Sequence, residues 1–530
     1  MIESVRIQNL RSLNDTGFIN LKKINILLGA NSSGKSTFLR SFPLFTQSLH
    51  KNLQGPISWF DNAYVDFGDY QTAKNRYAPK EETITFSYSL RKPRALFRYM
   101  YQLLTDIGPI STESIDEVKL SVSYANDSIG TYVNKIVISL ADIDFKYLIE
   151  NRNGLVKYFV KNIERPFPRC KWDQSTRTTT LPTFILDQTE KDNVKKIDAY
   201  LIKAAVECAR KSCDGHLKHL SKFNSVFTEW IYDENEYLYR LRNITAVPSL
   251  RKKANVWSVD SEIFLELYNK SADIYIYSLL CVISSEITAF YNNSSYIAPL
   301  RAEANRYYRS QGLQVNEIDS NGKNLDEFIR SLTDRQKASY NEFCLNTLGV
   351  KVETQYKNGH NCIILKNKDG YDDNLIDVGF GYSQVLPILT KVWHAGQVNR
   401  KTYNNFYYRY FDTDDSLILI EQPELHLHPA MQAKVADTLV GLIAKVEEEK
   451  EKHENPSEAP VRIVIETHSQ AIVYRIGRRI REKKISNEDV NVVLFSQKKD
   501  SKDTEVLQIH FDENGKLLNW PYGFFDPNED

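Results

Sequence analysis

A phosphate-binding motif near the start of the chain and its expected acidic partner near the end constrain the fold most strongly. Residues 29–36, GANSSGKS, match the pattern G-x-x-x-x-G-K-[ST] at every fixed position. The acidic partner is Glu421, which follows the apolar run Leu417 to Ile420 in the segment LILIEQPE. An ordinary P-loop enzyme holds both motifs in one compact domain. The long interval therefore predicts a nucleotide site whose two halves are separated by a large insertion.

The context of the first motif supports binding of ATP. Ile24 to Leu28 is a short apolar run typical of a buried parallel strand, and Ser36 to Ser48 is predicted to form a helix. Glycines let successive backbone N–H groups point at phosphate oxygens, and the helix N-terminus adds positive partial charge. Lys35 is expected to reach the β- and γ-phosphates and Ser36 to ligate Mg²⁺. The predicted ATP-binding residues here are Gly29, Asn31, Ser32, Ser33, Gly34, Lys35, Ser36 and Thr37.

Composition sets broad limits on the class of protein. The 530 residues include 68 basic and 68 acidic side chains, so net charge gives no general attraction to nucleic acid or membranes. The length allows two or three domains. The six cysteines form no Cys-x-x-Cys pair, which argues against structural zinc and favours reduced thiols. The N-terminus lacks a signal-peptide core, and the apolar stretch Ile274 to Ile283 is too short to span a bilayer. We expect a cytoplasmic protein.

Three regions follow one another along the chain. Alternating apolar runs between residues 83 and 160 indicate an antiparallel sheet, so residues 1–165 are predicted to form an N-terminal ATPase lobe. Residues 166–290 are predicted to be a mainly helical insertion, with helices at Val194 to Cys213 and Phe264 to Tyr291. Residues 291–530 are predicted to form a C-terminal ATPase lobe, in which one helix covers Leu325 to Leu348 and two strands end near Asp377. The expected fold class is α/β, with a mixed central sheet, an antiparallel lobe and a helical insertion.

The acidic strand end carries the catalytic candidates. Glu421, at the tip of its strand, is suited to holding Mg²⁺ directly or through its water shell. The next position normally carries the carboxylate that polarises the attacking water, and here it is Gln422. A neutral amide orients a water but cannot accept its proton. Either Glu424 does the polarising or hydrolysis is slow and ATP acts mainly as a clamp.

Two further segments complete the predicted site. Asp377 to Gln384, DVGFGYSQ, is a glycine-rich turn before a predicted helix, another place to hold phosphate oxygens through Gly379, Gly381 and Ser383. Val461 to Glu466 is predicted to be a strand, and His468 follows at its tip, where a histidine can hydrogen-bond the γ-phosphate.

Two histidines beside the acidic segment invite a metal interpretation. His426 and His428 are two residues apart, but nothing else in the chain completes a ligand set. Pro429 is expected to start the next helix.

The order of these motifs resembles the ABC-type branch of P-loop ATPases that includes the SMC and Rad50 proteins. The amino-acid sequences of the motifs resemble more closely those of the OLD-like prokaryotic AAA-family ATPases. The resemblance covers residues 1–100 and 290–530 well and the middle poorly. It rests on DVGFGYSQVLP (377–387), IEQPELHLHP (420–429), YIAPLR (296–301) and WPYGFFD (520–526). Members often carry a C-terminal Toprim nuclease domain, for which this sequence leaves no room after residue 530. In this it is similar to the PtuA ATPases of Septu anti-phage systems, including retron-linked ones.

The resemblance implies roles and partners. Lys35, Ser36, Glu421, Glu424 and His468 take nucleotide roles, and Ser383 with its flanking glycines acts across a homodimer or higher even oligomer. Gln71 is the candidate Mg²⁺-sensing glutamine, and Arg301 is a further candidate. The implied partners are an HNH nuclease of the PtuB kind and a reverse transcriptase with its msDNA, or another nucleic acid.

Two alternatives remain open. One is a DNA-repair or DNA-end-processing ATPase, which long heptad arms would favour; the sequence has none. The other is an OLD-like nuclease in its own right, which requires a separate carboxylate cluster. The C-terminal candidates for it, which lack strand-tip placement, are Asp500, Asp503, Asp526, Glu529 and Asp530.

Overall fold

The structure is a computed structural model. It describes residues 2–51, 53, 55–91, 117–140, 143–152, 154–173, 180–181, 183–186, 197–213, 226, 233–309, 312, 314–367, 371–397, 416–452, 461–497 and 504–520.

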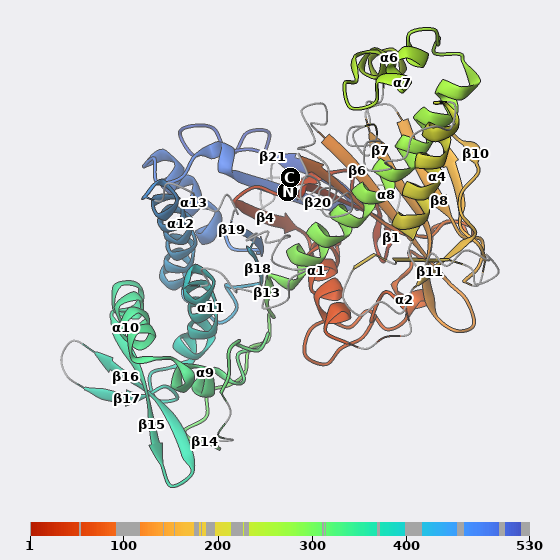
Figure 1. Cartoon of the computed structure of the whole chain (residues 1–530). Coiled ribbons are helices and arrows are strands. Elements are labelled where there is room, and N and C mark those ends of the chain that lie inside the picture. The colour runs from red at the N-terminus through yellow and green to blue at the C-terminus, as the bar shows by residue number, and fades with distance from the viewer. Residues whose placement is uncertain are drawn as a thin grey trace.

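A mixed six-stranded sheet lies at the centre of the molecule (Figure 1). Neighbouring strands are parallel, except that the last strand runs antiparallel to its neighbour. Two strands that follow the insertion, at residues 461–466 and 490–497, thus lie directly beside the P-loop strand. In spatial order the strands are β13 (Ser294–Ile297), β18 (Ser416–Glu421), β19 (Val461–Glu466), β4 (Ile24–Gly29), β20 (Val490–Gln497) and β21 (Thr504–Ile509).

A second, antiparallel sheet of nine strands forms the N-terminal lobe. The first strand of the chain pairs with the predicted strand near residue 85, so the N-terminus belongs to this sheet rather than to the central one. Its strands are β1 (Ile2–Leu10), β2 (Leu13–Asp15), β3 (Ile19–Asn20), β5 (Ile84–Arg91), β6 (Glu117–Asn126), β7 (Thr131–Leu140), β8 (Ile143–Leu148), β9 (Lys157–Val160) and β10 (Ile163–Arg165). A separate hairpin joins β11 (Cys170–Asp173) to β12 (Thr183–Leu186).

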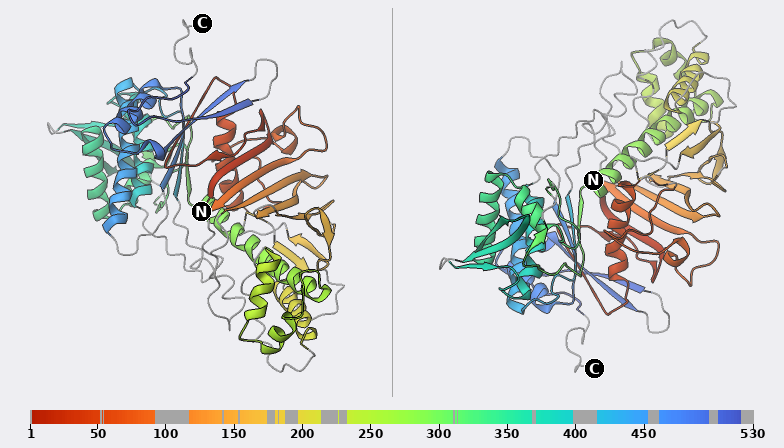
Figure 2. Two further views of the ribbon diagram at one scale, coloured as in Figure 1. Left: turned by 90° about the horizontal axis from the view of Figure 1, so that it is seen from above. Right: turned by 90° about the horizontal axis from the view of Figure 1, so that it is seen from below.

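The two faces of the central sheet bury alternate side chains in two cores. Leu27 contributes to the core shared with the antiparallel sheet and helix α1 (Lys35–Leu49), whereas Ile26 and Leu28 face the other core. That second core packs helices α11 (Phe380–Gln397), α12 (Pro429–Lys452) and α13 (Gln470–Arg481) against the sheet. Figure 2 shows these helices and the antiparallel sheet on opposite sides of the central sheet.

The segment between the lobes contains helices in addition to the hairpin β11–β12. The helices are α4 (Ile197–Lys211), α6 (Glu234–Asn243), α7 (Pro248–Ala254) and α8 (Glu262–Asn292). The apolar stretch judged too short to span a bilayer lies within α8, which has 31 residues. By length and composition α8 could cross a membrane, but 78% of its most apolar 18-residue stretch is buried inside the protein. Its apolarity is accounted for by packing against α1 and α4.

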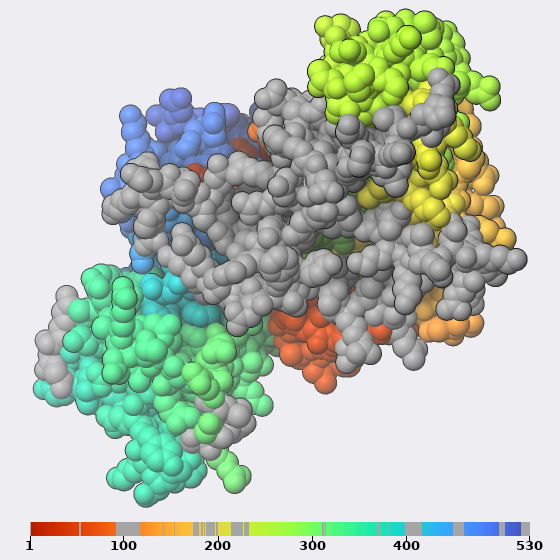
Figure 3. All heavy atoms as spheres, viewed as in Figure 1, coloured from red at the N-terminus to blue at the C-terminus, as the bar shows by residue number. Residues whose placement is uncertain are grey.

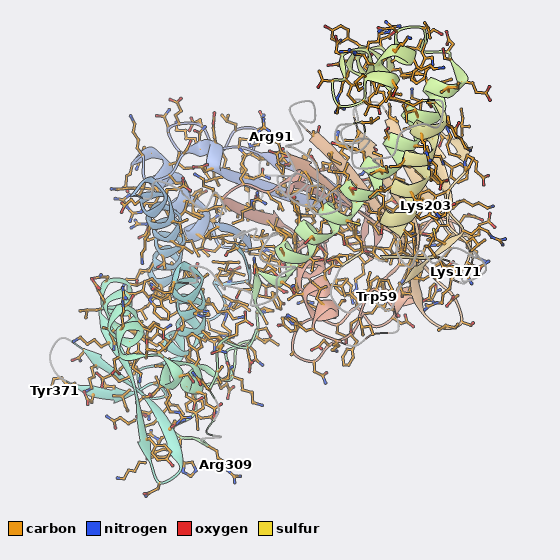
Figure 4. All side chains as sticks on the ribbon, in the orientation of Figure 1. Trp59, Arg91, Lys171, Lys203, Arg309 and Tyr371 are labelled. Atoms are coloured by element: carbon orange, nitrogen blue, oxygen red, sulfur yellow. The ribbon has the colours of Figure 1, made fainter. Side chains whose placement is uncertain are left out.

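A small lobe consists of α9 (Leu325–Ser331), α10 (Asp334–Leu348) and a four-stranded sheet. Its buried residues continue the second core, and the lobe projects at the lower left of the molecule in Figure 3. The prediction of one helix over 325–348 is wrong. Thr333 and Gln336 form a capping box that starts α10 anew after α9 has ended. The strands are β14 (Tyr308–Arg309), β15 (Val350–Lys357), β16 (His360–Asn367) and β17 (Asp372–Asn374). Figure 4 places Arg309 and Tyr371 at the outer edge of this lobe.

The predicted fold class is confirmed: the chain combines a mixed P-loop sheet, an antiparallel sheet and intervening helices. The short helix α2 (Tyr70–Ala73) and the 3₁₀ helix η3 (Asn487–Asp489) complete the described elements.

Candidate functional site

The loop between β4 and α1 requires glycine at two positions. Gly29 has φ +151°, and a Cβ there would lie 2.2 Å from the carbonyl oxygen of Phe495 on β20. Gly34 has φ +105°, and a Cβ there would lie 2.6 Å from Cδ2 of Leu13. The backbone can therefore curl tightly against the sheet at the N-terminus of α1. This is the shape that presents successive N–H groups to an anion.

Lys35 lies buried within this loop. Its Nζ donates hydrogen bonds to the carbonyl oxygens of Gly29, at 2.9 Å, and Ala30, at 2.7 Å. Burial lowers the pKa of Lys35, and the nearby carboxylates Glu466 and Glu424 partly counter this. The ammonium group is therefore held between the loop and the tips of the neighbouring strands.

Glu421 ends β18, as predicted, but its carboxylate is occupied. Arg40 on α1 donates to it from Nε at 2.9 Å and from a terminal nitrogen at 2.5 Å. The hydroxyl of Tyr296, from the YIAPLR segment, donates to the same carboxylate at 2.7 Å. This buried group thus joins the P-loop helix to strands β18 and β13.

Sequence reasoning missed Glu466 as a site residue. It ends β19 in register with Glu421 on β18, and Ser36 donates a hydrogen bond to its Oε1 at 2.6 Å. Its Oε2 is buried without a hydrogen-bond partner among the described residues. Burial and the charge of Glu421 raise the pKa of Glu466 to about 7. The same signal that selected Glu421, an acidic residue at a strand tip, was present in Val461 to Glu466.

The predicted switch segment is tied to Glu424. Its two carboxylate oxygens accept hydrogen bonds from Thr467 Oγ1, at 2.8 Å, and from the backbone N–H of His468, at 2.7 Å. His468 as a whole residue is exposed, but partial desolvation of its ring together with the charge of Lys35 lowers its pKa. The neutral imidazole is then the favoured form at neutral pH, able to donate a hydrogen bond near Lys35.

The turn after β18 is fixed by backbone contacts. Gln422 has φ +44°, and its N–H donates to the carbonyl oxygen of Glu466 at 2.8 Å. A terminal nitrogen of the buried Arg301 donates to the carbonyl oxygens of Glu421, at 3.2 Å, and Gln422, at 3.0 Å. Burial lowers the pKa of Arg301 to about 10. Arg301 therefore holds the backbone of the turn that carries Gln422.

The predicted signature segment differs from expectation at its serine. Helix α11 begins at Phe380, before Ser383, because Gly379, with φ +93°, supplies the turn. Ser383 therefore lies inside the first turn and is only 5% exposed, whereas Asp377 and Gly379 are exposed. Lys391, further along α11, donates to the carbonyl oxygen of Tyr296 at 2.6 Å. The signature helix is thereby connected to the tyrosine that holds Glu421.

The remaining candidates lie apart from this network. Gln71 is exposed on α2. His428 Nδ1 accepts from the N–H of Ala430 at 3.3 Å, and α12 begins at Pro429 as predicted. No group of three or more His, Cys, Asp or Glu that could hold a metal ion occurs within the described ranges. The C-terminal carboxylates weighed for a nuclease, and most of the WPYGFFD motif, lie outside those ranges.

The residues present fit ATP with Mg²⁺. Gly29 is required by close backbone packing and Gly34 by its positive φ. Ser33 Oγ and Glu466 Oε2 are buried without a hydrogen-bond partner among the described residues. Lys35, the loop N–H groups and Ser33 would hold the phosphates. Ser36 and a strand-tip carboxylate would hold Mg²⁺.

The family follows from a sequence comparison. Residues 1–473 match the family described as "AAA ATPase domain". The chain belongs to this family. Residues 485–530 match a second family, described as "Protein of unknown function (DUF3696)". No curated protein is significantly similar in sequence.

Solved structures similar to this ATPase include three SMC heads. An SMC head bound to the C-winged helix domain of ScpA has 10% identity and a TM-score of 0.35, covering 97% of this chain and 98% of that one. A head with coiled coil and joint from Pyrococcus yayanosii has 11% identity and a TM-score of 0.36, covering 97% and 98%. The head from Thermotoga maritima has 7% identity and a TM-score of 0.32, covering 96% and 98%. Values this low support no inference, so the fold assignment rests on the strand order.

The raised pKa of Glu466 predicts a pH-dependent stability. The unfolded chain releases this proton near the ordinary pKa of 4.5 and the folded chain near 7. The stabilisation is complete below pH 4.5 and is lost as pH rises through 7, amounting to about 3 kcal/mol at most. Urea unfolding at pH 5 and pH 8, without nucleotide, should show a smaller loss of stability in Glu466→Gln than in wild type. Asp273, whose pKa burial raises to about 7, is present in both proteins and cancels. Equal losses would contradict the prediction.

Proposed function

We propose that this chain is an ABC-type ATPase that dimerises around ATP and regulates a partner nuclease in anti-phage defence, in the manner of OLD-like PtuA proteins. The observation that carries the ATPase part is the direct hydrogen bonding among the P-loop, the strand tips and the switch segment. Ser36 donates a hydrogen bond to Glu466, and Arg40 donates one to Glu421. Glu424 accepts a hydrogen bond from the backbone N–H of His468. Residues from both ends of the chain thus meet around Lys35.

The chemistry assigns a role to each group. Lys35 and the loop N–H groups bind and orient the phosphates of ATP. Mg²⁺ when bound neutralises phosphate charge. Gln422 orients the attacking water without taking its proton, and Glu424 is engaged by Thr467 and His468 rather than free to act as a base. Slow hydrolysis, with ATP acting as a clamp, agrees with this arrangement.

Two copies are proposed because apolar side chains are exposed beside the signature and the strand tips. Ile376, next to Asp377, is 44% exposed, and Leu300, next to Arg301, is 78% exposed. A second copy would cover them and place its exposed Gly379 against the bound ATP. Light scattering of the purified chain tests this: its mass should double with ATP and Mg²⁺. A mass unchanged by ATP would refute the clamp.

A nuclease partner is proposed on the resemblance to the Septu proteins, and an HNH nuclease is the expected type. Helices α6 and α7 lie at the far end of α8 from the central sheet (Figure 1) and offer a docking surface. Arg251 and Lys252 there are exposed, as are Tyr239 and Val256. A reverse transcriptase with msDNA or another nucleic acid is the alternative occupant. Co-purification with the product of an adjacent HNH gene, and a cytoplasmic location, would agree with the proposal.

Gln422→Glu should accelerate ATP hydrolysis at least roughly ten-fold, because a positioned general base contributes on the order of 10²–10⁴ in rate. The substitution preserves shape and leaves the backbone bond from residue 422 to Glu466 intact. Phosphate release under single-turnover conditions measures the chemical step. Gln355→Glu, on β15 of the small lobe, is the matched control. An unchanged rate would show that proton transfer to this position is not limiting.

A further inference from the structure

The carboxylates at the tips of β18 and β19 have different partners. Both oxygens of the Glu421 carboxylate accept hydrogen bonds from protein groups: Arg40 donates to both oxygens, and Tyr296 donates to one of them. For Glu421 to ligate Mg²⁺ directly, the metal would have to displace the guanidinium of Arg40 from the carboxylate. The guanidinium cation would then lie beside a dication. Coulomb repulsion at such separation opposes the exchange.

Glu466 presents the opposite situation. Its Oε1 accepts a hydrogen bond from Ser36, the P-loop residue whose hydroxyl is suited to Mg²⁺. Its Oε2 has no hydrogen-bond partner within the described part of the chain, and the residue is only 1% exposed. A buried carboxylate oxygen without a donor is unfavourable in the protein alone. A cation held beside Ser36 would satisfy it.

We propose that Glu466 is the carboxylate that serves Mg²⁺ beside Ser36, in direct contact or through a metal-bound water, and that Glu421 is a positioning residue. The proposal rests on the proposed ATPase function. Protein sites for Mg²⁺ use one or two carboxylates together with substrate phosphates rather than an all-protein cage. One free carboxylate oxygen beside the P-loop hydroxyl meets that requirement.

The positioning role of Glu421 follows from what it connects. Arg40 links it to helix α1, and Tyr296 links it to β13. The carbonyl oxygen of Tyr296 in turn accepts from the buried Lys391 on α11. Glu421 therefore fixes the P-loop helix relative to the signature helix through a chain of hydrogen bonds.

Metal dependence of ATP affinity distinguishes the two carboxylates. Calorimetry of the full chain with ATP, first in EDTA and then with increasing Mg²⁺, gives the gain in affinity that the metal provides. Glu466→Gln is isosteric and should bind metal-free ATP as wild type does, while the Mg²⁺-dependent gain falls at least roughly ten-fold. Glu421→Gln should keep most of the gain but lower the melting temperature. Glu353→Gln, which removes a partly exposed carboxylate paired with Lys366 on the sheet of the small lobe, is the control for loss of one charge.

The outcomes are separable. Failure of the wild-type chain to bind ATP in any metal concentration would refute the proposed function itself. If wild type binds ATP and Glu466→Gln keeps the full Mg²⁺-dependent gain, or Glu421→Gln alone loses it, the assignment of Glu466 is overturned. If circular dichroism shows that Glu466→Gln does not fold, Glu466→Asp replaces it. That variant keeps the charge but withdraws the carboxylate, and a reduced gain is again expected.

Discussion

Replacing Lys35 with alanine is expected to weaken ATP binding at least roughly 100-fold. The side chain is buried in the loop between β4 and α1, and its ammonium group has the loop carbonyls and the strand-tip carboxylates around it. Loss of several charge-assisted hydrogen bonds to phosphate costs about 3 kcal/mol or more, because each contributes about 1.5–3 kcal/mol. Calorimetry with ATP and Mg²⁺ measures the change.

The matched control for this variant is Lys23→Ala. Lys23 precedes the same strand, β4, at its opposite end, where it pairs with Asp489 and Glu447 at the surface. Its loss should leave ATP affinity unchanged, since surface ion pairs contribute little and no phosphate is expected there. Both variants should have the circular dichroism spectrum of wild type. Retained affinity in Lys35→Ala would show that ATP is not bound by this loop.

The sequence was most informative where structure depends on neighbouring residues. The P-loop, the strand before it and the helix after it are local features, and the structure has them at the predicted positions. The break between α9 and α10 was also readable, because Thr333 and Gln336 have the spacing of a capping box.

Contacts between distant segments could not be predicted in the same way. Arg40 is a plain helix residue in sequence, and only the packing of α1 against the central sheet makes it the partner of Glu421. Glu466 was recognisable as a strand end, but its contact with Ser36 depends on β19 lying between β18 and β4. Ser383 was expected before its helix, and the left-handed turn at Gly379 places it inside. Propensity does not specify such a one-turn shift.

The burial of Ser383 makes it a poor position at which to test a dimer. An arginine at position 383 would replace a buried side chain within α11 and disturb the fold as well as an interface. Ile376 is the better position, because it is exposed immediately before the signature segment and loses little packing when replaced.

Ile376→Arg is therefore expected to abolish the ATP-dependent dimer while leaving the ATP affinity of the monomer, and the melting temperature without nucleotide, unchanged. Burying an unpaired guanidinium at an interface costs several kcal/mol, enough to weaken dimerisation by roughly 100-fold or more. Sedimentation velocity with ATP and Mg²⁺ measures the dimer. Tyr356→Arg, which alters an exposed side chain on β15 of the same small lobe, is the control and should still dimerise. A dimer that survives Ile376→Arg would place the contact between copies elsewhere and would remove the signature segment from the second copy's site.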